Sequence, residues 1–151
     1  MRQPARRLIL LLLAGLAAAP VSAAEAGKQH RVVFQVDTAE PATMNLTLNN
    51  ATNVVDYYRA KNEEVEIDIV AFGPGLAMYR ADKSTVADRI AHFADYGFPS
   101  KIQFSACNNT KTAMERAEGH PVTLLPQATI VPSGVVQIME RQEQGWSYVR
   151  P

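Results

Sequence analysis

The stretch Phe104-Ser105-Ala106-Cys107-Asn108-Asn109-Thr110 joins a short apolar segment to residues that commonly begin helices. The apolar segment, residues 102–106, is typical of a buried strand, and Asn108 or Asn109 is typical of a helix N-cap. The sequence therefore predicts that Cys107 lies between the carboxyl end of a strand and the positive end of a helix. A thiolate is stabilised in such a position, and ligands commonly bind there in open α/β sheets. Cys107 is thus the first candidate functional residue.

Residues 1–23 have the pattern of a secretory signal peptide. Three arginines precede the apolar run Leu8–Ala19, and Val21-Ser22-Ala23 supplies a small-x-small cleavage site. The apolar run is shorter than the roughly 20 residues that a membrane-spanning helix needs. We therefore expect a mature domain, residues 24–151, exported to the periplasm without stable membrane insertion after cleavage. A retained membrane anchor is the alternative, and it would be revealed by the absence of cleavage.

The charge and the cysteine count limit the possible partners. Three of the 15 basic residues lie in the predicted signal peptide, which leaves 12 basic residues against 15 acidic ones. The mature chain has no basic excess, which argues against nucleic acid as a partner. Its length, about 128 residues, is typical of one domain. One cysteine in an oxidising compartment has no internal disulfide partner, so Cys107 is buried and inert, paired between chains, or free.

Apolar and amphipathic segments alternate along the mature chain. The expected strands are Arg31–Val36, Val65–Phe72, Lys101–Ala106 and Gln127–Val131. The expected helices begin near Pro41, Ser84, Cys107 and Ser133, with Ser84 as a cap. Serial β-α units predict a three-layer α/β/α domain with a mainly parallel sheet, right-handed crossovers and helices on both faces. Residues 76–83 are expected to be a loop, and residues 146–151 an arm packed on the body or on a neighbour.

The first expected helix has the clearest periodicity. Its apolar residues recur at spacings of three and four, namely Met44, Leu48, Ala51, Val55 and Tyr58. This spacing places them on one side of a helix, which we expect to face the sheet.

The residues that follow each strand are expected to meet at one edge of the sheet, because parallel strands end together. This edge would hold a thiol, backbone N–H groups, hydroxyls and one arginine, a combination that suits a small anion or an anionic sulfur. Besides Cys107, the candidate ligand-binding residues are Asp37, Gly73, Gly75, Arg80, Asn108, Thr110 and Ser133. Arg80 is equally compatible with a solvated surface position, and Asp37 is more typical of a cap or turn than of a catalytic base.

Other common chemistries lack residues that they require. His30 and His120 precede strands and His92 lies within a helix, so no histidine of the same chain is expected to serve Cys107 as the base of a cysteine hydrolase. A histidine from a neighbouring subunit remains an alternative. The turn after the first strand lacks a dinucleotide fingerprint, and the chain has neither a Walker loop nor a nucleophile elbow. Closely spaced metal ligands are absent from the sequence, so neither a metal site nor a cofactor is predicted.

Several segments, in the same order, resemble the DsrE/DsrF-like family, which includes YchN-type proteins. They are Val70–Leu76, Ala106–Thr110, Ile130–Val135 and Gln144–Pro151, with Asn49 and Asn53 in the first expected helix. The resemblance covers essentially the whole mature chain and implies a Rossmann-like, flavodoxin-type single domain. Sulfur-relay members of this family carry a persulfide on a cysteine at the end of the equivalent strand. Cys107 matches that position.

The resemblance implies an exported sulfur carrier that acts through Cys107 and exchanges sulfur with a donor or acceptor protein or a small thiol. The chain differs from the relay proteins in having Asn-Asn-Thr after Cys107 and an export signal before the domain. Family members form trimers or hexamers, so a homo-oligomer is expected. The alternative is a non-catalytic module for small-ligand binding or assembly, in which Cys107 is buried for structural reasons.

Overall fold

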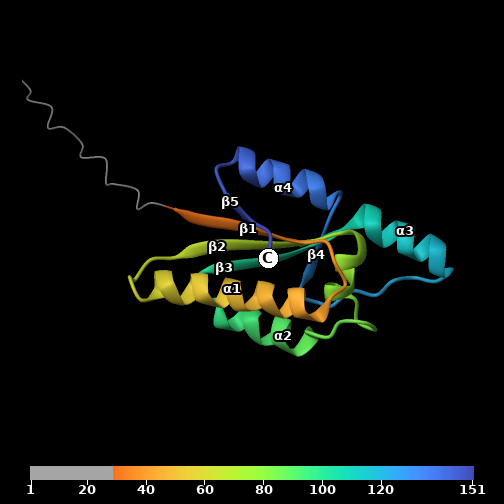
Figure 1. The fold of residues 1–151 in the computed structure, drawn as a ribbon, viewed down its shortest axis with the longest axis horizontal. Coiled ribbons are helices and arrows are strands. Elements are labelled where there is room, and N and C mark those ends of the chain that lie inside the picture. The colour runs from red at the N-terminus through yellow and green to blue at the C-terminus, as the bar shows by residue number, and fades with distance from the viewer. Residues whose placement is uncertain (1–28) are drawn as a thin grey trace, which may run out of the picture.

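The centre of the protein is a five-stranded sheet in the order β4-β3-β2-β1-β5, in which all four neighbouring pairs are parallel (Figure 1). Its strands are β1 His30–Val36, β2 Val65–Ala71, β3 Lys101–Cys107, β4 Ala128–Val131 and β5 Ser147–Val149. The computed structural model describes residues 29–151. The predicted signal peptide and its cleavage site therefore lie outside the described residues. The prediction of a mainly parallel sheet is confirmed.

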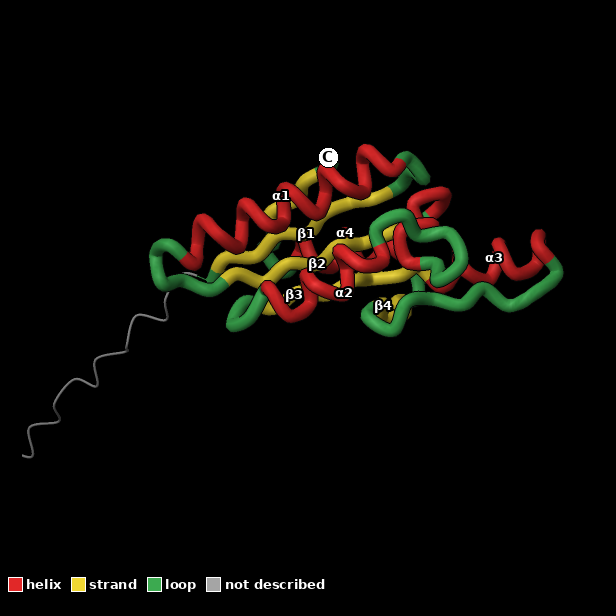
Figure 2. Tube along the Cα trace, turned by 90° about the horizontal axis from the view of Figure 1, so that it is seen from below, coloured by secondary structure: helices red, strands yellow, loops and turns green. Residues whose placement is uncertain are grey.

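Helices cover both faces of the sheet, as expected for a Rossmann-like α/β domain. The helices are α1 Pro41–Arg59, η1 Gly73–Tyr79 (a 3-10 helix), α2 Ala87–Tyr96, α3 Asn108–Glu118 and α4 Gly134–Glu143. α1 and α2 lie on one face and α4 lies on the other, whereas α3 extends beyond the carboxyl edge of the sheet (Figures 1 and 2). Within residues 29–151, no helix combines the length and the apolar character needed to cross a membrane.

The two faces of the sheet have cores of different size. The larger core lies beneath α1 and α2 and includes Met44, Leu48, Ala51 and Val55, so the predicted stripe of α1 is confirmed. Tyr58, at the end of the stripe, is partly buried. The smaller core lies beneath α4 and consists of Val33, Val70, Ile138 and Trp146. The apolar strands β1 and β2 are therefore covered on both sides, which is typical of parallel strands.

Residues 73–83 were expected to form a turn followed by a loop. They begin instead with the 3-10 helix η1. Its residues Leu76, Met78 and Tyr79 are buried in the larger core, and the Tyr79 hydroxyl donates a hydrogen bond to the Ile69 carbonyl at 2.6 Å. Tertiary packing of these apolar side chains, which no local periodicity reveals, holds the tight helical turn.

The starts of α2 and α3 differ from the predicted caps. α2 begins at Ala87 with Val86 at the N-cap position. Ser84 orders the preceding turn: its hydroxyl oxygen accepts a hydrogen bond from the Val86 N–H at 3.3 Å, and the hydroxyl donates to the Met78 carbonyl at 2.6 Å. α3 begins at Asn108, and Cys107 itself holds the N-cap position with extended backbone (φ −67, ψ 116). The strand thus passes directly into the helix, without the extra turn residue that an Asn cap needs.

The carboxyl-terminal segment is part of the sheet and not a separate arm. Residues 147–149 form the edge strand β5, which pairs with β1 and places Tyr148 opposite Val33. All three residues of β5 are exposed, so β5 lacks the alternation of buried and exposed side chains by which a strand is predicted from sequence. The neighbouring backbone of β1 and the burial of Trp146 decide this conformation.

Candidate thiol site

Cys107 lies where two helices begin. It ends β3, occupies the N-cap position of α3 and is paired in register with Val131 of β4. α4 begins three residues after Val131, at Gly134, so the pairing of β3 with β4 brings the start of α4 to Cys107. The cysteine is free and only 4% exposed. The positive ends of two helices therefore meet near one buried sulfur.

Burial and neighbouring hydrogen-bond donors act in opposite directions on the acidity of this thiol. Burial raises the pKa of Cys107, but the Thr110 hydroxyl and the backbone N–H groups of Gly134, Thr110 and Asn109 act in the opposite direction. The hydrogen bonds outweigh burial, so the pKa of the thiol lies below its ordinary value. A thiol with a lowered pKa is the form that reacts as a nucleophile. We call Cys107, Asn109, Thr110 and Gly134 the thiol site.

Thr110 connects the thiol to the loop that follows β2. The Gly73 N–H donates a hydrogen bond to the Thr110 Oγ1 at 2.9 Å. Because this oxygen already accepts a hydrogen bond, its own proton is well placed for donation to the sulfur. Gly73 has a φ of +52, a conformation that favours glycine. The sequence prediction that Gly73 and Thr110 lie near Cys107 agrees with this arrangement.

Gly134 allows α4 to approach closely. A Cβ atom at this position would lie 2.9 Å from the Cβ and Cδ1 atoms of Phe72, which is too close for ordinary packing. The preceding turn also contacts α3, because the Asn109 N–H donates to the Pro132 carbonyl at 3.3 Å. The absence of a side chain at Gly134 therefore lets the first turn of α4 lie against Phe72, close to the strand end that carries Cys107.

Three residues at or beside the site were not predicted from the sequence. Gly134, Asn109 and Phe72 were not among the candidates, although a glycine that opens a helix after a strand was a usable signal. Two candidates lie at the same edge without contributing a donor to the sulfur. Asn108 is the exposed first residue of α3, and Ser133 occupies the N-cap position of α4.

Arg80 was expected to offer an anion-binding guanidinium, and the structure corrects this. It is 2% exposed and pairs with Asp82 at 2.7 Å and with Glu118 at 2.5 and 2.8 Å. Glu118 ends α3, so Arg80 lies at the opposite end of this helix from Cys107. A bridge between Arg80 and Leu124 fixes the backbone there. The guanidinium is occupied by carboxylates and is not available to a ligand at the thiol.

Asp37 and Gly75 have structural partners. The Asp37 carboxylate accepts hydrogen bonds from Gln35 at 3.0 Å and from Arg150 at 2.8 Å, which ties the end of the chain to β1. This agrees with a turn residue and not with a catalytic base. A Cβ atom on Gly75 would lie 2.1 Å from the Val36 carbonyl oxygen, so Gly75 permits a close backbone contact.

Comparison with known proteins places the chain in a family. No protein-family model matches the sequence, and no curated protein matches it. The solved structure of MTH1491 from Methanobacterium thermoautotrophicum, described as a protein of unknown function, is 33% identical to this chain. The match covers 82% of this chain and 100% of that chain, with a TM-score of 0.66. The chain belongs to the family of MTH1491. The α/β fold of this MTH1491 relative is therefore shown by both sequence identity and structure.

In this member of the MTH1491 family, histidines lie away from the thiol. His30 begins β1, at the opposite edge of the sheet, where it contacts Glu63 at 2.8 Å and stacks on Tyr58 at 3.8 Å. His92 lies on the exposed side of α2. Among residues 29–151, no three His, Cys, Asp or Glu side chains are grouped so that they could hold a metal ion.

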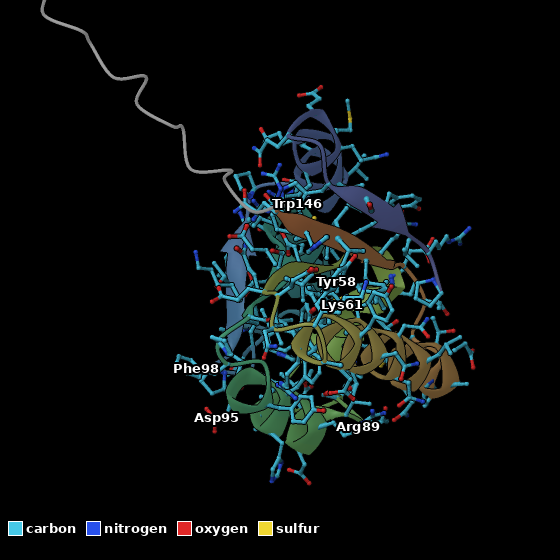
Figure 3. All side chains as sticks on the ribbon, turned by 90° about the vertical axis from the view of Figure 1, so that its left-hand side faces the viewer. Tyr58, Lys61, Arg89, Asp95, Phe98 and Trp146 are labelled. Carbon is cyan, nitrogen blue, oxygen red and sulfur yellow. The ribbon has the colours of Figure 1, made fainter. Side chains whose placement is uncertain are left out.

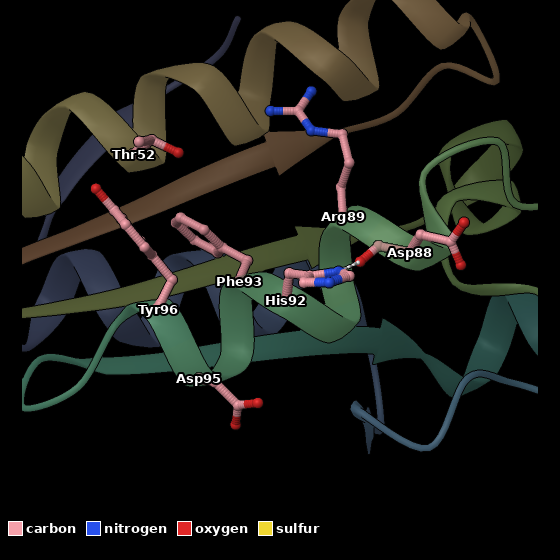
Figure 4. Close-up of a pocket in the computed structure, with 7 residues that line it drawn as sticks. All are labelled: Thr52, Asp88, Arg89, His92, Phe93, Asp95 and Tyr96. Carbon is pink, nitrogen blue, oxygen red and sulfur yellow. Dashed lines mark hydrogen bonds between the residues drawn. The ribbon is translucent and has the colours of Figure 1, made fainter.

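An open groove of about 710 Å³ between α1 and α2 is separate from the thiol site. Arg89, Phe93 and Tyr96 extend from α2 toward α1, whereas Asp95 points away (Figure 4). Arg89 donates to the side-chain oxygens of Asn45 and Asn49 at 2.5 and 2.8 Å, so Asn49 belongs to a helix–helix contact. Arg89 and Asp95 lie on the opposite side of the molecule from Trp146, which is close to α4 (Figure 3). In this MTH1491 relative, the groups around Cys107 and not this groove identify the candidate site.

Proposed function

We propose that the protein is an exported sulfur carrier of the DsrE/DsrF type, which holds a persulfide on Cys107. The observation that supports this most strongly is the position of Cys107 at the N-cap of α3 and beside the start of α4, where neighbouring donors hold the pKa of the thiol below its ordinary value. Donors arranged in this way stabilise an anionic sulfur. Export to the periplasm is part of the proposal and is supported by the pattern of residues 1–23.

The proposed cycle has two exchange steps. In loading, the Cys107 thiolate attacks the outer sulfur of a donor persulfide, the sulfur–sulfur bond of the donor breaks, and the donor leaves as a thiolate. The new sulfur–sulfur bond gives Cys107 a persulfide that keeps the proton of the outer sulfur. In unloading, an acceptor thiolate attacks that outer sulfur and Cys107 leaves as a thiolate. One sulfur atom moves and no external oxidant is needed.

The donors of the thiol site act in both steps. They increase the thiolate fraction available for loading, and they stabilise Cys107 as the leaving group in unloading, since a thiol of lower pKa leaves faster. The donor and the acceptor are each a protein or a small thiol in this proposal.

The proposal includes a homo-oligomer, a trimer or a hexamer. It is supported by the outer side of α4, where Val135, Val136 and Met139 are 52%, 47% and 53% exposed. Adjacent exposed apolar side chains are typical of an association surface. Light scattering on the purified protein tests this, with a mass of one chain as the contradicting result.

A second candidate function is a small-ligand-binding or assembly module with a packed thiol. The 4% exposure of Cys107 favours it, because buried free cysteines often only fill space. Titration with an aromatic disulfide reagent under native and denaturing conditions separates the two candidates. A carrier thiol is expected to react in the native protein, and a packed thiol only after unfolding.

Intact-mass analysis after treatment with a persulfide donor tests the first proposal directly. Because Cys107 is the only cysteine, a gain of one sulfur atom can be assigned to it. The gain is expected in the wild type and is expected to be absent in Cys107→Ser. No gain in the wild type, or the same gain in both proteins, would contradict the proposal.

A further inference from the structure

A buried carboxylate anchors α4 to the sheet. Asp68 of β2 is 0% exposed and lies on the face of the sheet that α4 covers. Its Oδ2 atom accepts hydrogen bonds from the Gln137 Nε2 at 2.7 Å and from the Arg141 Nε at 2.8 Å. Gln137 and Arg141 are four residues apart and therefore project from the same side of α4.

Two residues of β3 close this contact into a ring. The Ser105 hydroxyl donates to the Asp68 Oδ1 at 2.6 Å, and the Gln103 Nε2 donates to the Ser105 oxygen at 2.8 Å. The Gln103 Oε1 in turn accepts a hydrogen bond from the Arg141 Nη2 at 3.1 Å. Each of the four side chains thus has two partners within the ring, and the geometry of a closed polar ring tolerates little displacement.

The ring is connected to the thiol through both elements that build the site. Ser105 lies two residues before Cys107, on the same face of β3. Gln137 lies one helical turn after Gly134, on the same side of α4. The anchored helix begins three residues after Val131, the register partner of Cys107, so its first turn lies at the strand end that carries the thiol.

Stability alone is a weak reason for a charged pair at this position. Replacing a buried ion pair with apolar residues of similar volume is often neutral or stabilising. The apolar contact of α4 with Val33 and Val70 supplies burial but little direction. Directed hydrogen bonds, in contrast, define how far along the sheet the helix lies and how it is rotated.

We propose that Asp68, Gln137 and Arg141 are positioning residues of the thiol site, because they hold the first turn of α4, with the Gly134 N–H, beside Cys107. The inference rests on the proposed function in that it assigns these residues to the chemistry of Cys107. They act through Gly134 and do not touch the reacting sulfur.

The first test is Gln137→Met, which removes one anchor while keeping the volume and the net charge similar. Gln137 is only partly buried, so the variant is expected to fold. The pKa of Cys107 is expected to rise, and the thiolate fraction near neutral pH to fall by about threefold to tenfold. Thiolate absorbance in the ultraviolet measures this, with Cys107→Ser in the same background as the blank. Gln142→Met is the matched control: the same change on the same helix at an exposed residue.

Asp68→Asn separates positioning from direct electrostatics by its sign. Removing a negative charge would by itself favour the thiolate and lower the pKa of Cys107. Loss of the anchor moves the Gly134 N–H away from the thiol and is expected to raise the pKa of Cys107. A higher pKa in Asp68→Asn supports positioning, and a lower one overturns it. If Asp68→Asn does not fold, Gln137→Met decides.

The inference is overturned if Cys107 has the same pKa in Gln137→Met as in the wild type. That result would show that Gln137 has a merely structural role, whatever the melting temperature of the variant. Persulfide uptake by the wild type is measured separately by intact mass. If the wild type takes up no sulfur, the proposed function fails, while the pKa comparison still decides whether the ring positions the thiol.

Discussion

Gly73 and Thr110 are joined by a hydrogen bond from the Gly73 N–H to the Thr110 Oγ1 at 2.9 Å. The same hydroxyl is a donor to the Cys107 sulfur. One threonine thus links the loop after β2 to the thiol, so the loop takes part in setting the acidity of Cys107.

Thr110→Val removes the hydroxyl while keeping the shape of the side chain. We expect the pKa of Cys107 to rise, because one donor to the thiolate is lost and burial, which raises the pKa, is unchanged. The Gly73 N–H also loses its acceptor, so stability is expected to fall by about 1–2 kcal/mol. Thiolate absorbance and urea unfolding measure the two effects. Thr112→Val on the same helix is the control, and an equal pKa in both variants would refute the assignment.

Gly134→Ala introduces a methyl group that would lie 2.9 Å from the Phe72 side chain. α4 must shift to relieve this overlap, which is expected to cost about 1–3 kcal/mol of stability. It is also expected to raise the pKa of Cys107, since the N–H moves away from the sulfur. Adding Phe72→Ala makes room for the methyl group, so the two substitutions should be non-additive. Strictly additive losses of stability in urea unfolding would count against this contact.

Gly75→Ala and Gly73→Ala should differ although both lie in the same loop. A Cβ atom on Gly75 would lie 2.1 Å from the Val36 carbonyl oxygen, and a backbone atom cannot rotate away, so we expect a loss of about 3 kcal/mol or more. Gly73 has open space around it but a φ of +52, so its substitution should cost about 1–2 kcal/mol. Equal losses in urea unfolding would show that space at Gly75 is not limiting.

Glu118→Gln is expected to change how stability depends on pH. Arg80 lowers the pKa of Glu118 from its ordinary value near 4.5 to about 2 in the folded protein. A lowered folded-state pKa stabilises the protein above the unfolded-state pKa, and this contribution is lost as the pH falls from about 4.5 toward 2. The variant should therefore lose less stability than the wild type over this interval. Melting temperatures across the interval test this, and Glu143→Gln at an exposed position is the control. Parallel curves for the wild type and Glu118→Gln would contradict the expected role of Arg80.

Local patterns in the sequence determined most of the architecture. The spacing of Met44, Leu48, Ala51 and Val55 identified the buried side of α1, and apolar segments identified the central strands. The position of Cys107 at a strand end beside a helix start was also predictable. These features depend on neighbours a few residues away, so periodicity and capping preferences are sufficient to reveal them.

Only the tertiary structure decided which groups meet. The pairing of Cys107 with Val131 brings Gly134 to the sulfur, β1 makes a strand of three exposed residues at 147–149, and Glu118 occupies Arg80. The ring around Asp68 likewise joins β2, β3 and α4. Each of these contacts depends on the register between distant segments, which short-range patterns do not contain. The sequence by itself determined where the thiol stands, and the packing of α4 on the sheet decided which groups surround it.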